Sequence, residues 1–187
     1  MAFYPDERIG LFIDGPNFYT SVRALNVEID YAKLLEWFRK RGRLVCAKYY
    51  TALMDDQEYS PLRKMVDWLD YNGFTIISKT AKEYTDPLTG RKRTKGDMDV
   101  DITVDALQAA GWLDHIILCS GDGDFCPLLR AIQRKGVRVS VVSTLKSNPP
   151  VASDDLRRTA DAFIELEELA GQIARPARPA EDEPVTV

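Results

Sequence analysis

Aspartate residues recur at three points of this chain where apolar segments begin or end. They are Asp14 after the run 9–13, Asp97, Asp99, Asp101 and Asp105 in the segment 97–105, and Asp122 and Asp124 after the run 116–119. Carboxylates next to buried segments repel one another and are costly to desolvate. A fold that gathers several of them commonly holds a hard cation such as Mg²⁺ or Mn²⁺. If the three segments meet, we expect metal-dependent chemistry on phosphate esters.

The first of these segments ends in Asp14-Gly-Pro-Asn17. Asp14 follows a short apolar run, and Asn17 lies at the start of the next expected helix. Asp and Asn are common helix caps, so capping and catalysis both account for this pair.

The segment Ser120-Gly-Asp122-Gly-Asp124 is the stronger candidate for a functional site. Its two glycines allow a tight turn, and a helix is expected to begin at about Phe125. A helix cap explains one of the two carboxylates, but it explains neither the second carboxylate nor Ser120. A helix N-terminus also favours a phosphate at this position.

The third segment does not by itself single out a metal ligand. On a helical wheel Asp97, Asp101 and Asp105 share one face, and Asp99 points in nearly the opposite direction. A solvated acidic face would explain the first three, and Asp99 would then lie on the side that faces the protein. Spacing alone leaves open which of these residues binds a metal ion.

A run of cations precedes this segment, at Arg91, Lys92, Arg93 and Lys95. Basic residues beside an acidic site suit a polyanion, because they hold phosphates while a metal ion neutralises the one that is cleaved. A solvated surface loop is the alternative. We expect a loop over 83–96, where Pro87, Gly90 and Gly96 lie among polar residues.

Apolar segments alternate with amphipathic ones along the chain, which indicates an α/β fold with a parallel sheet of about five strands covered on both faces. The expected strands are 9–13, 44–53, 74–78, 115–119 and 137–142; the expected helices follow Asp14 and Ser60 and span 31–40, 97–110, 125–135 and 155–169. Function in such folds lies beyond the carboxyl ends of the strands. Asp14 and Asp122 should therefore share one edge of the sheet.

The composition excludes several classes of protein. The chain has 187 residues and a net charge of −4, so it fits one domain, and any nucleic-acid contact needs a local basic patch. The three cysteines lack zinc-site spacing, and a single histidine argues against histidine-based hydrolases. We expect a domain over 1–173 and a disordered tail over 174–187, which is rich in Pro, Ala, Arg and Glu. No signal or membrane segment is evident, so a cytoplasmic location is expected.

Taken in order, three motifs resemble those of the NYN domain, a PIN-like nuclease family, in its LabA-like branch. They are Phe-Ile-Asp14-Gly-Pro-Asn17-Phe, Lys95-Gly-Asp-Met-Asp99-Val-Asp101-Ile-Thr-Val-Asp105 and Ser120-Gly-Asp122-Gly-Asp124-Phe. The resemblance spans 9 to about 163 and implies a single Rossmann-like three-layer α/β/α domain. It also implies cleavage of single-stranded or structured RNA with Mg²⁺ or Mn²⁺ as cofactor.

By this resemblance the residues divide into three roles. The catalytic acids would be Asp14, Asp99, Asp122 and Asp124, of which Asp14, Asp99 and Asp122 would bind metal; Asn17, Ser120 and Asp101 would support them. The cations Arg91, Lys92, Arg93 and Lys95 are the expected nucleic-acid contacts. The expected enzyme is a Mg²⁺- or Mn²⁺-dependent endoribonuclease that hydrolyses RNA with a metal-activated water.

Other functions fit parts of this pattern. A non-catalytic module that binds RNA or protein is one alternative, although close carboxylates without a metal ion would be unfavourable. An aspartyl-nucleophile phosphatase would need a second Asp two residues after Asp14, where Pro16 stands instead. The sequence leaves open the RNA target, RNA against DNA, endonucleolytic against exonucleolytic cleavage, one metal ion or two, and the oligomeric state, with a homodimer as one alternative.

Overall fold

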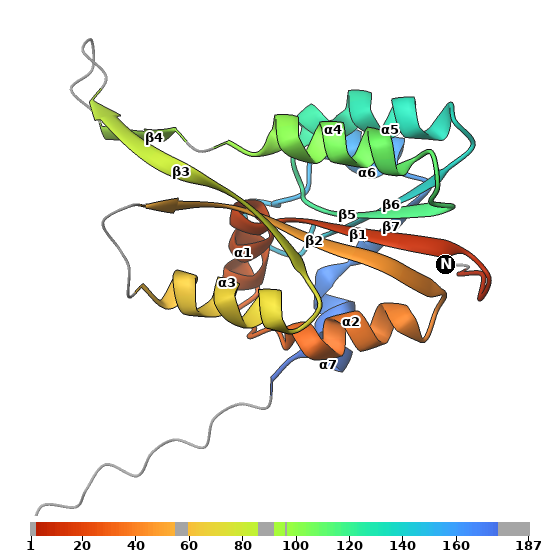
Figure 1. Ribbon diagram of the computed structural model, residues 1–187, viewed down its shortest axis with the longest axis horizontal. Coiled ribbons are helices and arrows are strands. Elements are labelled where there is room, and N and C mark those ends of the chain that lie inside the picture. The colour runs from red at the N-terminus through yellow and green to blue at the C-terminus, as the bar shows by residue number, and fades with distance from the viewer. Residues whose placement is uncertain (1–2, 55–59, 86–91, 96, 176–187) are drawn as a thin grey trace, which may run out of the picture.

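One seven-stranded sheet forms the centre of the molecule (Figure 1). The computed structural model describes residues 3–54, 60–85, 92–95 and 97–175. The strand order is β4-β3-β2-β1-β5-β6-β7, and every strand except β4 runs parallel to its neighbours. The strands are β1 Arg8–Asp14, β2 Arg43–Met54, β3 Thr75–Thr85, β4 Lys92–Lys95, β5 His115–Cys119, β6 Arg138–Ser143 and β7 Ala162–Glu165.

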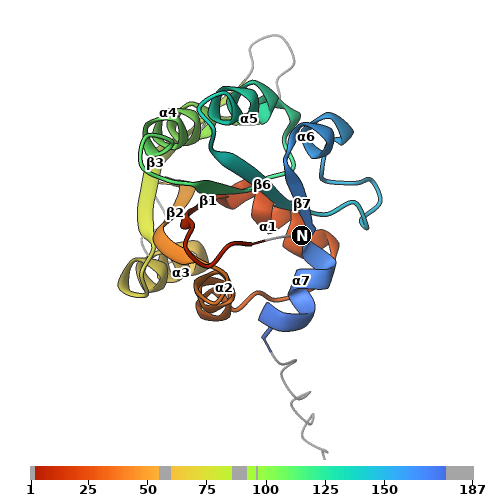
Figure 2. The same ribbon diagram turned by 90° about the vertical axis from the view of Figure 1, so that its right-hand side faces the viewer.

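Helices cover both faces of this sheet, as the parallel strands require. They are α1 Gly15–Ala24, α2 Tyr31–Arg39, α3 Pro61–Tyr71, α4 Asp99–Ala109, α5 Cys126–Gln133, α6 Asp154–Thr159 and α7 Leu166–Ile173, with a short 3₁₀ helix η1 Gly123–Phe125 before α5. Figure 2 shows α4, α5 and α6 on one face and α1, α2, α3 and α7 on the other. The expected three-layer α/β/α fold is therefore confirmed. No helix in the described ranges is long and apolar enough to cross a membrane.

Each face has its own apolar core, and the central strand contributes to both. In β1, Leu11 and Ile13 pack in the core that includes Phe18 of α1. Phe12 points to the opposite face, in the core that includes Ile102 of α4. This alternation follows from the period of two residues in a strand. It fixes the rotation of β1, and therefore the position of Asp14 at its end.

The strand register brings two of the acidic segments to one edge. β1 pairs in parallel with β5, and Ile13 lies opposite Cys119. Asp14 is the next and last residue of β1, and Ser120 directly follows β5. The chain therefore leaves the two strands side by side. The prediction that the segments with Asp14 and Asp122 share the carboxyl edge agrees with this register.

The expected loop over 83–96 is wrong in part. β3 continues to Thr85, and β4 pairs with it in the antiparallel direction, with Lys82 opposite Lys95 and Thr85 opposite Lys92. Figure 1 shows this hairpin extending away from the body of the sheet. Because an edge hairpin needs no apolar run, the polar composition of 83–95 concealed it. Residues 86–91 and 96 lie outside the described residues.

The single helix expected over 155–169 is also wrong. The chain forms α6, then the edge strand β7 parallel to β6, then α7. Asp161 ends α6 by pairing with Val139, whose N–H donates to Asp161 Oδ2 at 2.8 Å, while the Asp161 N–H donates to the Val139 carbonyl at 2.9 Å. Tertiary pairing therefore overrides a helical apolar pattern, and the sheet gains a sixth parallel strand.

The start of the expected tail contacts the domain. Ala174 forms a bridge with Ile29, and the Arg175 N–H donates to the Glu28 carbonyl at 2.8 Å. The other residues of that prediction, 176–187, lie outside the described residues.

Candidate functional site

Asp14 is held rigidly at the end of β1. Its side chain is only 7% exposed. One carboxylate oxygen accepts from the Ser120 hydroxyl at 2.9 Å, and the other accepts from the Asn17 N–H at 3.4 Å, which caps α1. Capping and site formation, two alternatives at the sequence level, therefore coexist in one residue.

Ser120 and Asn17 connect this strand end to the turn after β5. The Ser120 hydroxyl also accepts from the Asp122 N–H at 3.2 Å, and Asn17 Oδ1 accepts from the Gly121 N–H at 2.8 Å. Asp122 Oδ1 then accepts from the Asp124 N–H at 2.9 Å and caps η1. These bonds hold the two acidic segments in one fixed arrangement.

The segment before α4 brings Asp99 to the same place. Asp99 begins α4 and lines a cleft together with Asp14, Asp122 and Asp124. The cleft has a volume of about 550 Å³ and is open to solvent. Oxygen atoms of Asp99, Asp122 and Asp124 all lie within 4.8 Å of one another. Asp14 is on the floor of the same cleft but does not belong to that closest group.

Asp101 and Asp105 lie on the other side of α4 and have different partners. Asp101 forms an ion pair with Lys79 of β3. Asp105 Oδ2 accepts from Lys48 Nζ and from the Tyr50 hydroxyl, both at 2.8 Å. The expected acidic face exists, but lysine side chains of the sheet neutralise it. Asp101 is therefore engaged away from the cleft.

Asp97 also lines the cleft, although the sequence pattern placed it on the helix face of Asp101 and Asp105. Because α4 begins at Asp99, Asp97 precedes the helix and does not follow the face of Asp101. Its Oδ1 accepts from the Asp99 N–H at 3.0 Å, and it lines the cleft. The Asp-x-Asp spacing before a helix was the available signal, because Asp commonly accepts from the N–H two residues later.

Burial and nearby charge raise the pKa of two acids of this cleft, Asp99 and Asp14. Burial raises the pKa of Asp99 to about 7, and its hydrogen bond and charge interaction with Asp97 act in the same direction. Burial also raises the pKa of Asp14, although its hydrogen bonds with Ser120 and Asn17 oppose the shift. The positive ends of the α1 and α4 dipoles lie at this site and favour negative charge there.

A hard divalent cation fits these residues. The donors are all carboxylate oxygens, which Mg²⁺ and Mn²⁺ prefer over nitrogen or sulfur. A cation would offset both the burial and the charge repulsion that raise the pKa of Asp99 and Asp14. Asp99, Asp122 and Asp124 are close enough to act together as ligands.

The predicted basic contacts lie just before this cluster in the chain. Lys92, Arg93 and Lys95 are on β4, which ends four residues before α4 begins at Asp99. Arg91 lies outside the described residues.

Comparisons with known proteins identify the family of this chain. The NYN domain model matches residues 8–167. Low amplitude and bright protein LabA of Synechococcus elongatus is 31% identical over 182 residues, which cover 96% of this chain and 94% of that protein. An uncharacterised protein of Methanocaldococcus jannaschii is 27% identical over 87% of this chain and 57% of its own length.

A solved structure has the same fold. The crystal structure of a protein of unknown function from Vibrio parahaemolyticus superposes with a TM-score of 0.74 at 29% identity, and the match covers 94% of this chain and all of the other. The match of the NYN domain model over 8–167 and the identity to LabA together decide the family. The chain belongs to the NYN domain family, a family of PIN-like nucleases.

Proposed function

We propose that this protein is a ribonuclease that hydrolyses phosphodiester bonds of RNA with Mg²⁺ or Mn²⁺ bound in the acidic cleft. The observation that carries the proposal is the approach of the Asp99, Asp122 and Asp124 carboxylates to within 4.8 Å of one another. Such an arrangement is unfavourable without a cation, because like charges at this range repel one another.

In this proposal the acids divide into two roles. Asp99, Asp122 and Asp124 would hold the cation, and the buried Asp14 would add negative charge next to them. When bound, the cation neutralises charge on the scissile phosphate and makes a water molecule more acidic. Ser120 and Asn17 position the acids, because they bond Asp14 and the turn at Gly121. Asp101 is left out of this set because Lys79 holds it.

The substrate also needs contacts outside the cluster. A polyanion approaching four carboxylates is repelled unless cations compensate. The cations Arg91, Lys92, Arg93 and Lys95 are proposed to hold phosphates next to the cleaved one, because β4 (Lys92–Lys95) ends four residues before α4 begins at Asp99. Phosphate contacts of this kind position a strand without reading its sequence.

The test is cleavage of labelled RNA and DNA by the purified full chain with Mg²⁺, with Mn²⁺ or with EDTA. We expect RNA cleavage that requires the metal ion. Asp122→Asn should lower the rate at least about 100-fold, because it removes a ligand and a charge that act in the transition state.

Asp101→Asn is the matched control on α4. It removes one carboxylate charge, as Asp122→Asn does, and should retain cleavage, because Asp101 is paired outside the cleft. Equal loss in the two variants would contradict the assignment. If the wild-type chain binds RNA but cleaves neither RNA nor DNA with either metal ion, the protein is a binding module and the proposal fails.

A further inference from the structure

A groove leads from the acidic cleft along the surface between α1 and α3. Beyond the cleft lies a hollow of about 520 Å³, which shares Pro16 and Ala52 with it. A second hollow of about 570 Å³ follows and shares Tyr19 and Met65 with the first. Each hollow therefore shares lining residues with the next, and the three lie in a row along α1 and α3, here called the α1–α3 groove.

One face of α1 forms the first wall of this path. Pro16, Tyr19 and Arg23 lie at positions i, i+3 and i+7, so they project on the same side of the helix. Tyr19 is 58% exposed, which is unusual for a large aromatic side chain. The Arg23 guanidinium lies 5.9 Å from the centre of the Tyr19 ring. This wall combines an exposed ring with a cation.

The second wall belongs to α3 and has the same character. Leu62, Met65 and Trp68 repeat every three residues, and Leu62 and Trp68 are 38% and 39% exposed. Lys64 lies next to Met65 at the far hollow. Two helices that begin at the same sheet edge thus present aromatic, apolar and basic groups to one groove.

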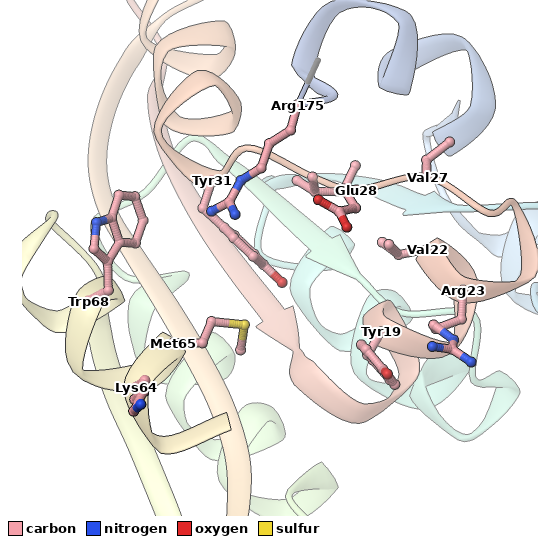
Figure 3. Close-up of a pocket in the computed structure, with 11 residues that line it drawn as sticks. Tyr19, Val22, Arg23, Val27, Glu28, Tyr31, Lys64, Met65, Trp68 and Arg175 are labelled. Atoms are coloured by element: carbon pink, nitrogen blue, oxygen red, sulfur yellow. The ribbon is translucent and has the colours of Figure 1, made fainter. Parts of the chain in front are cut away.

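The far hollow is the most basic part of the groove. Figure 3 shows Trp68 and Met65 on one side, Tyr19 and Arg23 on the other, and Arg175 extending over Tyr31 between them. Arg23, Lys64 and Arg175 give three cations against one carboxylate, Glu28. The chain as a whole carries a net charge of −4, so this concentration of cations is local.

We propose that the α1–α3 groove binds the segment of single-stranded RNA that continues beyond the cleaved phosphate. The proposal rests on the ribonuclease function proposed above and adds where the strand runs. Bases would stack on Tyr19 and Trp68, and Arg23, Lys64 and Arg175 would neutralise backbone phosphates. Aromatic platforms beside cations are the usual means of holding a single strand without sequence preference.

Charge and the position next to the cleft favour RNA over a polypeptide as the occupant. A purely apolar segment would leave three cations at the far hollow without partners. The groove also borders the cleft, with which it shares Pro16 and Ala52, so a strand bound at the cluster would next meet this surface. A duplex would not present the unstacked bases that exposed rings accept.

The first experiment measures stacking on Trp68 with the full chain in EDTA, where cleavage is blocked. Titration with a single-stranded oligouridylate should quench tryptophan fluorescence, and Trp68→Phe should remove most of that quench. Trp112 is the matched control, because it is 42% exposed but lies outside the groove, after α4. Trp112→Phe should leave the quench intact.

The second experiment measures phosphate contacts by fluorescence anisotropy with a labelled oligouridylate at several salt concentrations. Arg23→Ala should weaken binding about tenfold and lower the slope of log affinity against log salt by about 0.7, as expected for one lost contact to a single strand. Arg134→Ala, an exposed cation that follows α5 on the opposite face of the sheet, should change neither.

The outcomes separate this proposal from the one on which it rests. Unchanged RNA affinity in both Trp68→Phe and Arg23→Ala overturns the groove, whether or not the protein cleaves RNA. Weaker binding in both variants supports the groove even if no cleavage is found. With cleavage present, Arg23→Ala should slow the cleavage of a long RNA but not of a dinucleotide, which is too short to reach the far hollow. If a peptide binds in the groove and RNA does not compete with it, the groove proposal is also overturned.

Discussion

At the scale of single residues, the partner of each carboxylate decides whether it belongs to the site. Asp99 and Asp101 are two positions apart in α4, and a helix turns their side chains about 200° apart. Asp101 forms an ion pair with Lys79 of the sheet, whereas Asp99 lines the cleft. The wheel could separate these two residues, but only the packing of α4 on the sheet identifies the side that faces the cleft. The remaining signal in the sequence was Lys79, a charged residue within a parallel strand that could pair with one of these acids.

Asp99 also gives the protein a pH dependence that can be measured without substrate. Its pKa is about 7 in the folded protein, against an ordinary value of 3.8. Between these pH values the folded protein binds this proton more tightly than the unfolded chain. The free energy of unfolding therefore falls as pH rises through that window. We expect Asp99→Asn to raise Tm in EDTA at pH 8 and to have little effect at pH 4.

The control for that measurement is Asp101→Asn. It removes an equivalent charge but breaks the ion pair with Lys79, so Tm at pH 8 should fall slightly or stay constant. If Asp99→Asn raises Tm relative to wild type no more at pH 8 than at pH 4, repulsion in the cluster is weak.

At the scale of elements, the sequence could predict those that bury an apolar stripe. Five parallel strands, and all helices except those near the C-terminus, follow from apolar runs of the appropriate period. The β3–β4 hairpin and β7 could not be predicted in this way. The hairpin is polar on an edge, and β7 is short and depends on pairing with β6. Local patterns do not encode such pairings.

The site was predictable to the same degree. Strand ends placed Asp14 and Asp122 at one edge by topology alone. Asp97 was assigned to a helix face because the expected helix began two residues too early. An error of two residues in a helix boundary is small for the fold, but it moves a side chain into or out of a site.

The turn after β5 is the element in which the site depends most closely on packing. A Cβ at Gly121 would lie 2.5 Å from the Val151 carbonyl oxygen and 2.7 Å from Ser143 Oγ. The backbone contact cannot move without displacing the turn that carries Asp122. We expect Gly121→Ala to destabilise the fold by about 1–3 kcal/mol in urea unfolding, as overpacking commonly does, and to lower metal-dependent cleavage.

Gly171 provides the opposite case in α7. Nothing lies within 4 Å of a Cβ built at that position. Gly171→Ala should stabilise the protein by about 0.5–1 kcal/mol, because alanine favours the helix. If the two substitutions had equal effects, the packing account of Gly121 would be wrong.

At the scale of the whole molecule, one buried histidine far from the cluster opposes the acids in its effect on stability. His115 is the single histidine of the chain and is fully buried. Burial lowers its pKa to about 4, and the charge of Arg138 acts in the same direction. Between about pH 4 and the ordinary value of 6.5 the unfolded chain binds a proton that the folded protein excludes. This contribution therefore makes stability rise with pH, opposite in sign to that of Asp99.

His115→Gln tests that contribution in urea unfolding at several pH values in EDTA. The variant should make stability rise less steeply with pH between about 4 and 6.5, whereas Asp99→Asn should make it rise more steeply. Parallel curves for wild type and His115→Gln would contradict the assignment. Because no other histidine is present, the comparison has one titrating imidazole.

Divalent cations should stabilise the whole fold through the acidic cluster. A ligand that binds only the folded state at 100 times its Kd adds about 2.7 kcal/mol. We therefore expect Mn²⁺ to raise Tm of the wild-type protein, and to do so more at pH 8 than at pH 6, because Asp99 must lose its proton to bind. Asp122→Asn should remove most of this shift. Asp101→Asn should keep the Mn²⁺-induced rise in Tm, since Asp101 lies outside the cluster. If the rise survives in Asp122→Asn but not in Asp101→Asn, the cation binds on the side of α4 that faces Lys79 instead.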